Sequence, residues 1–89
     1  MKGLFAESLA GHDKGQVYVI VGAEGAYAYV ADGRLKRIEK PKRKNIKHLQ
    51  VMKAKCDEGL REKLQNGQAV TNEEIKYSIK RNFKCQNPT

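Results

Sequence analysis

The sequence predicts a mainly β fold with a C-terminal α part, namely a small antiparallel barrel or sandwich followed by one or two short helices. Residues 4–31 alternate β-rich runs with glycines, as hairpin-connected strands do. Residues 57–83 change to a helical period with capping signals. The 89 residues make one small domain. We expect a barrel over residues 1–50, with residues 51–89 as a helical extension packed on it.

Three strands are expected early in the chain, over residues 4–9, 16–21 and 26–31. These runs are rich in β-branched and aromatic residues. Glycines in the connections at residues 11–15 and 22–25 permit the positive φ angles that tight turns need.

The strand pattern continues beyond this first group. The dipeptide Asp32-Gly33 is a strong signal for a two-residue hairpin, so a fourth strand is expected over residues 35–38. Pro41 has no N–H to donate and should stop the pairing. Residues 45–49 can then form a short closing strand.

Two helices are expected in the last third of the chain. Residues 57–65 precede Gly67, a typical C-terminal glycine. Thr71 and Glu74 form a capping box, so a second helix should begin at Asn72. Its apolar stripe, which should pack on the barrel, follows the staple residue Val70 and consists of Ile75, Ile79 and Phe83.

The positive charge is concentrated in the middle of the chain. The formal net charge is +8, and residues 34–55 contain ten basic residues against Glu39 alone. The flanking zones are mildly acidic or nearly balanced. Such a charge favours a polyanionic partner, nucleic acid before an anionic membrane surface. Four apolar residues interrupt the basic zone and should anchor it to the core with the bases outward: Leu35, Ile38, Ile46 and Leu49.

Composition argues against membrane and secreted classes. The longest apolar run, residues 17–21, is far shorter than a membrane span, and the N-terminus lacks a signal-like apolar stretch. Cys56 and Cys85 have no paired CxxC spacing and are expected to be reduced thiols. These features predict a soluble, cytoplasmic protein.

The sequence gives little support for catalysis, a cofactor or a metal site. The phosphate-loop, dinucleotide-binding and nucleophile-elbow motifs are absent. His12 and Asp13 are adjacent in a loop, where neighbouring side chains usually point apart, and His48 lies among bases. A His and Cys metal site that adds Cys56 and Cys85 stays an alternative without ligand-like spacing. We therefore expect no enzyme, no cofactor and no metal.

Nucleic-acid binding has the better physical basis. The basic zone can neutralise several phosphates, and its arginines can also stack on exposed bases. Tyr18, Tyr27 and Tyr29 could stack on bases too, although packing within the barrel is the commoner fate of strand tyrosines. The binding prediction therefore rests on the basic residues.

Two stretches resemble a known family. Residues 9–21, with Gly15 in the loop and a third strand ending at Asp32-Gly33, resemble a KOW motif, which lies within an SH3-like barrel. Residues 42–49, with a basic triplet before an Asn-Ile-x-His-Leu run, resemble the archaeal and eukaryotic-type large-subunit ribosomal protein group numbered fourteen. The resemblance implies non-catalytic binding of ribosomal RNA through the loop and the basic segment, by a ribosomal or ribosome-associated protein with ribosomal proteins as further partners.

The resemblance and the charge together nominate the RNA-binding residues. An SH3-like module that docks a translation or transcription factor through its tyrosines is the alternative, and a small RNA-cleaving enzyme using His12 or His48 is a third. We expect charge reversal of residues 42–44 to weaken RNA binding while leaving the melting temperature nearly unchanged. The expected RNA-binding residues are Gly11, His12, Lys14, Gly15, Arg34, Lys36, Arg37, Lys40, Lys42, Arg43, Lys44, Asn45, Lys47 and His48.

Overall fold

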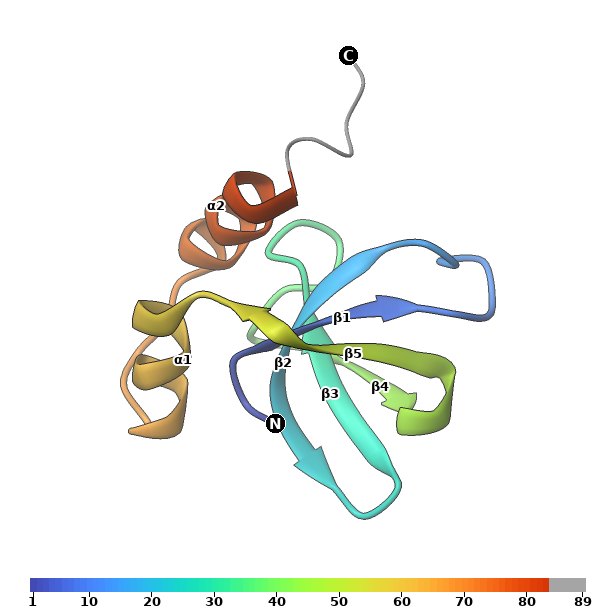
Figure 1. The fold of residues 1–89 in the computed structure, drawn as a ribbon. Coiled ribbons are helices and arrows are strands. Elements are labelled where there is room, and N and C mark those ends of the chain that lie inside the picture. Colours follow the sequence, from blue (N-terminus) through green and yellow to red (C-terminus); the bar gives the residue numbers. More distant parts are fainter. Residues whose placement is uncertain (84–89) are drawn as a thin grey trace.

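A five-stranded antiparallel sheet is followed by two helices in the computed structural model, which describes residues 1–83 (Figure 1). This confirms a mainly β fold with a C-terminal α part. Cys85 lies outside the described residues. The elements are β1 (Leu4–Ser8), β2 (Val17–Glu24), β3 (Tyr27–Ala31), β4 (Lys42–Asn45), the 3-10 helix η1 (Ile46–His48), β5 (Leu49–Cys56), α1 (Glu58–Gln65) and α2 (Asn72–Phe83).

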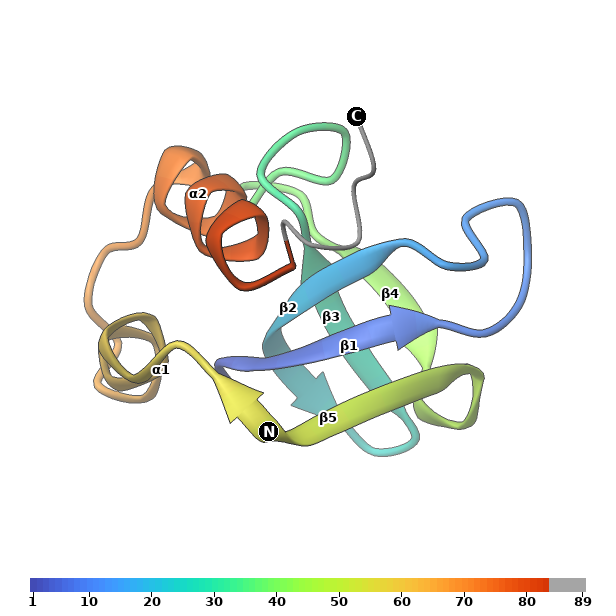
Figure 2. The same cartoon turned by 45° about the horizontal axis from the view of Figure 1, so that its top comes forward.

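The strands are arranged in the order β4-β3-β2-β1-β5, so the last strand returns to pair with the first. Every pairing is antiparallel, and irregularities of register occur after Leu4 and after Ile20. The sheet is strongly curled, and β4 and β5 form its two edges (Figures 1 and 2). No strand ladder joins these edges within the described part of the chain.

Each face of the sheet carries an apolar cluster. Along β1 and β2 the side chains alternate between two apolar clusters, since Phe5 and Val19 belong to one while Ala6 and Ile20 belong to the other. The first cluster includes Leu60, Leu64, Ile75 and Phe83 of the helices, whereas the second, built around Tyr18, lies within the curl of the sheet.

The fourth strand is not where the sequence predicts it. Residues 35–38 form a loop, because the Asp32 carboxylate accepts hydrogen bonds from the backbone N–H groups of Arg34 and Lys36, each at 2.9 Å. The strand instead begins directly after Pro41, which therefore marks the start of β4 and not the end of pairing.

The predicted closing strand over residues 45–49 is also wrong. The Asn45 side chain accepts from the N–H of Lys47 at 3.1 Å and caps η1, so these residues turn instead of extending. The closing strand is β5, which starts at Leu49 and continues to Cys56. Strand structure therefore runs past residue 50.

Both predicted helices are confirmed. Asp57 caps α1 by accepting from the Leu60 N–H at 3.2 Å, and Gly67 follows the helix with φ of 71°. Thr71 and Glu74 form the expected capping box at the start of α2, with two backbone-to-side-chain distances of 3.2 Å. The apolar stripe of α2 packs on the sheet, and the ring centroids of Phe83 and Phe5 are 5.0 Å apart.

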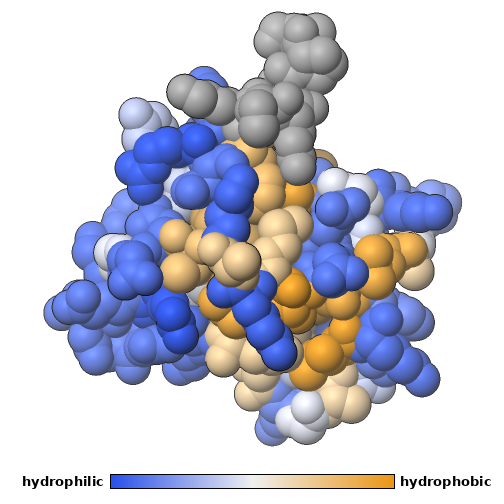
Figure 3. Space-filling model, in the orientation of Figure 1, coloured by the Kyte–Doolittle hydropathy of each residue, from blue (hydrophilic) through white to orange (hydrophobic). Residues whose placement is uncertain are grey.

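The helices lie together on one side of the sheet, away from the β1–β2 loop (Figure 2). On the face that Figure 1 presents, apolar side chains gather in the middle, over β1 and β5, and hydrophilic residues surround them (Figure 3). Within residues 1–83, no helix is both long enough and apolar enough to cross a membrane.

Candidate nucleic-acid interface

The predicted binding residues lie in three segments that the fold brings together. These are the β1–β2 loop, residues 9–16; the β3–β4 loop, residues 32–41; and β4 with η1, residues 42–48. Gln16 Nε2 donates to Asp32 at 3.3 Å and joins the two loops. The Leu9 N–H donates to the His48 carbonyl at 2.9 Å and joins η1 to the first loop. We call these segments together the basic region.

A half-buried acid, Asp13, connects the β1–β2 loop to the edge strand β4. The carboxylate of Asp13 accepts hydrogen bonds from Ser8 at 2.9 Å and from Tyr18 at 2.6 Å. It also accepts from Lys44 of β4 at 2.9 Å and from Lys42 at 3.3 Å. We call these five residues the Asp13 cluster; its contacts join the loop to β4 and to Tyr18 of the second apolar cluster.

Lys44 is an internal residue of this cluster. Its side chain is 9% exposed, and its ammonium donates to Ser8 Oγ at 2.8 Å, to the Ala10 carbonyl at 3.2 Å and to Asp13. An ammonium has three protons, so all its donors are used within the fold. Lys44 therefore does not present its charge to a partner, and Lys42 shares its charge with the same carboxylate.

The Asp13 cluster also sets the protonation of its members. Burial by itself would raise the pKa of the Asp13 carboxyl, but the hydrogen bonds from Tyr18, Lys44, Ser8 and Lys42 outweigh it and hold that pKa well below its usual range. Burial and the adjacent carboxylate raise the pKa of the Tyr18 hydroxyl far above its ordinary value. Asp13 is thus a permanent anion and Tyr18 a permanent donor at neutral pH.

The remaining predicted residues of the β1–β2 loop lie at the surface. His12 and Lys14 are exposed, as are the two glycines Gly11 and Gly15. Gly15 has φ of 92° and donates its N–H to the Ser8 carbonyl at 2.8 Å, which closes the loop. A side chain there would meet no atom within 4 Å, so the positive φ, not space, is the requirement for glycine.

The β3–β4 loop is held rigidly against α2. Asn72 Oδ1 accepts from the Ile38 N–H at 2.7 Å, and a Cβ at Gly33 would overlap the Asn72 carbonyl. Ile38 anchors the loop to the core as expected, but Leu35 does not, because it is 87% exposed at the loop tip. This frame carries four predicted bases with exposed or half-buried side chains: Arg34, Lys36, Arg37 and Lys40.

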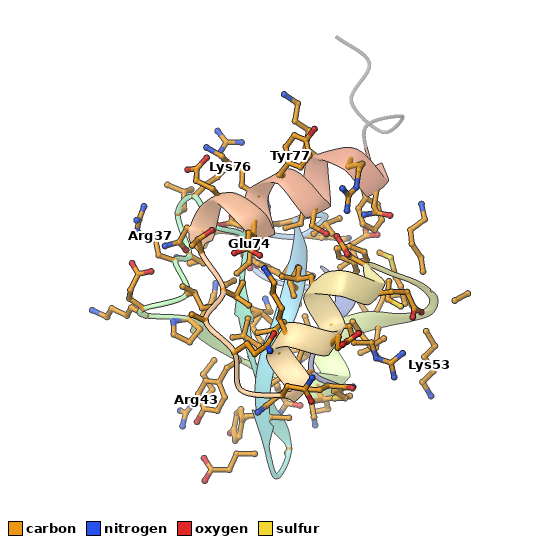
Figure 4. The ribbon with its side chains drawn as sticks, turned by 90° about the vertical axis from the view of Figure 1, so that its left-hand side faces the viewer. Arg37, Arg43, Lys53, Glu74, Lys76 and Tyr77 are labelled. Atoms are coloured by element: carbon orange, nitrogen blue, oxygen red, sulfur yellow. The ribbon has the colours of Figure 1, made fainter. Side chains whose placement is uncertain are left out.

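The bases of residues 34–55 do not share one face. Arg37 and Arg43 point outward on one side of the view in Figure 4, and Lys53 of β5 points outward on the other. Lys55 donates to the Asn82 carbonyl at 2.9 Å and lies over Phe83. Asn45 is half-buried as the cap of η1, and Lys47 and His48 are exposed.

Several bases of the basic region keep their charge free. Arg37 pairs with Glu39 at 3.1 Å, and Lys42 and Lys44 pair with Asp13. The one remaining acid of the region, Asp32, is buried and bonded to Gln16 and to the loop backbone, so it does not pair with the other bases. Within residues 1–83, six bases of the region form no ion pair: Lys14, Arg34, Lys36, Lys40, Arg43 and Lys47.

Within residues 1–83, the candidate catalytic and metal-binding side chains do not gather into a second site. No group of three or more His, Cys, Asp or Glu side chains comes within metal-binding reach in residues 1–83. A groove of about 250 Å³ lies between α1 and α2, where Lys63 pairs with Glu74 and Arg81 with Asp57, and no predicted binding residue lines it.

In comparisons with known proteins, no protein-family model matches the chain, and no curated protein matches it significantly.

Proposed function

We propose that this chain is a non-catalytic RNA-binding protein whose KOW-type, SH3-like barrel contacts structured RNA, ribosomal RNA first, through the basic region. It acts as a cytoplasmic ribosomal or ribosome-associated protein. A five-stranded meander whose last strand pairs with its first supports the barrel reading. The glycine-closed loop between β1 and β2 supports the KOW resemblance.

One observation carries the proposal. Six bases of the basic region form no ion pair in the described chain, while the acids Asp13 and Asp32 are turned inward and held by internal hydrogen bonds. The fold thus neutralises part of the basic zone and leaves the rest for a polyanion. Binding of up to six phosphates should make log affinity fall with log salt at a slope of roughly −4 to −5, at about 0.7 to 0.9 per phosphate.

Charge-matched variants test the proposal. Arg34→Glu with Lys40→Glu should lower the affinity for a structured ribosomal RNA fragment by at least about tenfold and make the salt slope shallower, since each reversal removes a phosphate contact. Lys53→Glu with Lys80→Glu makes the same change in net charge outside the basic region and should have a much smaller effect. Fluorescence anisotropy across a salt series, with a single strand and a DNA duplex for comparison, measures both.

Equal losses in the two double variants would contradict an interface located at the basic region. Binding that ignores salt would contradict RNA binding altogether and favour the SH3-like protein-docking alternative. Of the three tyrosines on which that alternative depends, Tyr18 is buried in the Asp13 cluster and does not reach the surface.

A further inference from the structure

Two tyrosines of β3 lie on the outer face of the sheet. They alternate with Ala28 and Val30, which are fully buried in the second apolar cluster, so Tyr27 and Tyr29 point the other way. Tyr27 is 39% exposed. The helices cover this face only near Ala31, and the β2–β3 hairpin extends beyond them (Figure 1).

The rings are held in place before any ligand arrives. The Arg43 guanidinium carbon lies 4.6 Å from the centroid of the Tyr27 ring. Tyr29 lies over Gly22, where a Cβ would be 3.6 Å from the ring, and its hydroxyl donates to Glu24 at 3.2 Å. We call these five residues the Tyr27 face.

The chemistry of the Tyr27 face fits a nucleobase better than a phosphate. Its two charges, on Arg43 of β4 and Glu24 of β2, are opposite and lie on the two strands that flank β3, so the face carries no net charge. It offers flat aromatic and guanidinium surfaces, which are the groups on which unpaired bases stack in RNA complexes. Phosphate-binding bases are close along the chain, because Lys47 follows two residues after Asn45, the register partner of Tyr27.

We propose that the Tyr27 face binds an unpaired nucleobase of the RNA whose phosphates contact the basic region. This inference rests on the proposed function and deepens it: the RNA target contains a single-stranded or bulged segment beside its structured part. A preformed stack costs little conformational entropy on binding, which is the advantage of arginine and tyrosine in such sites.

The test compares one RNA hairpin in two forms, blunt and with a short single-stranded extension. Tyr27→Ala should weaken binding of the extended hairpin by about tenfold or more, within the range that base stacking on aromatic residues supplies, and should leave binding of the blunt hairpin unchanged. Tyr27→Phe should bind like the original. The matched control is Tyr77→Ala. Tyr77 is exposed on α2, and the guanidinium carbon of Arg81 lies 5.8 Å from the centroid of its ring.

A spectroscopic readout locates the stacking itself. The fluorescence of 2-aminopurine in the extension should fall when the original protein or Tyr77→Ala binds, and should not fall with Tyr27→Ala. Equal affinities of Tyr27→Ala and the original for both hairpins would overturn the inference and leave the proposed function standing. Loss of a proline-rich peptide ligand in Tyr27→Ala with unchanged RNA affinity would assign the face to a protein partner instead. Absence of any salt-dependent RNA binding by the original protein would overturn both proposals.

Discussion

Lys44 belongs to a basic triplet in the sequence, but in the structure it is a buried residue that holds β4 to the β1–β2 loop. Lys44 and its neighbour Arg43 are adjacent on β4 and therefore face opposite ways, one into the Asp13 cluster and one onto the Tyr27 face. Charge alone does not distinguish them. The period of two along a strand does, once residues 42–45 are known to be a strand.

Removal of the Lys44 charge should therefore destabilise the fold. Lys44→Met removes a buried ammonium that donates to Ser8, Ala10 and Asp13, and breaking the pair in this way costs about 3 kcal/mol of the free energy of unfolding. Lys47→Met, at an exposed position of η1, should change it by less than about 0.5 kcal/mol. Urea unfolding measures both. Equal stability of the two variants would contradict a stabilising role of the Lys44 contacts.

The internal position of Lys44 also changes the expected effect of charge reversal at residues 42–44. Charge reversal there was expected to spare the melting temperature, but it would place a carboxylate of residue 44 against Asp13 and the buried Ser8. A lower melting temperature would then accompany any loss of RNA binding, so these positions cannot isolate binding from folding.

The depressed pKa of Asp13 gives a pH-dependent contribution to stability. The folded carboxyl has a pKa below the value of about 3.9 that it takes in the unfolded chain. The ionised form is thus favoured by folding, and its contribution is complete above about pH 5 and is lost as pH falls through and below 4. The difference in unfolding free energy between the original protein and Asp13→Asn should accordingly be largest near neutrality and shrink in acid. Urea melts between pH 2 and 7 measure it, and a constant difference would contradict the assignment.

At the scale of elements, the packing of the β3–β4 loop on α2 depends on one close approach. Gly33→Ala should lower the free energy of unfolding by about 2–4 kcal/mol, because its φ is 77° and the added Cβ overlaps the Asn72 carbonyl. Gly25→Ala is the matched control. It also has a positive φ, of 60°, but no atom lies within 4 Å of the added carbon, so it should cost only about 1 kcal/mol. Thermal or urea unfolding distinguishes the two, and equal losses would show that φ alone matters.

Elements whose signals are local could be predicted from the sequence. The helix that begins at Asn72 is one of them, because the capping box of Thr71 and Glu74 involves residues only three positions apart. The expected strand over residues 35–38 was wrong because Asp32 before a glycine also favours a side-chain-to-backbone turn, and that turn prevailed. β5 was missed because its lysines weaken the alternation and its partner, β1, lies more than 40 residues earlier.

The site was predicted in its segments but not in its roles. The basic residues were found by charge, and hydrogen bonds join the three segments that contain them. The Asp13 cluster was not foreseen, since Ser8, Tyr18 and Lys44 come from three strands and no short motif connects them. The only sequence signal for it is polar residues at positions where the alternation of β1 and β2 points inward.

At the scale of the whole molecule, burial divides the surface into regions of different use. One face of the sheet is packed within the curl and the other is covered by helices except at the β2–β3 hairpin, so the proposed binding groups lie on loops, edges and that hairpin. In the helical part, Lys63 pairs with Glu74, Lys76 with Glu73 and Arg81 with Asp57. Most of the bases that form no ion pair within residues 1–83 therefore lie on the strand part of the molecule.

The link between Asp13 and Lys44 also imposes an order on folding. The two residues are 31 positions apart in sequence, so the ends of that stretch must meet before the β1–β2 loop is fastened. Strands β2 and β3 can pair with their neighbours earlier, since hairpin contacts close short loops. The loop with His12 and Lys14 thus gains its final shape only after β4 has joined the sheet. During synthesis, a chain that has not yet released residue 44 from the exit tunnel therefore lacks the contacts of Lys44 with the β1–β2 loop.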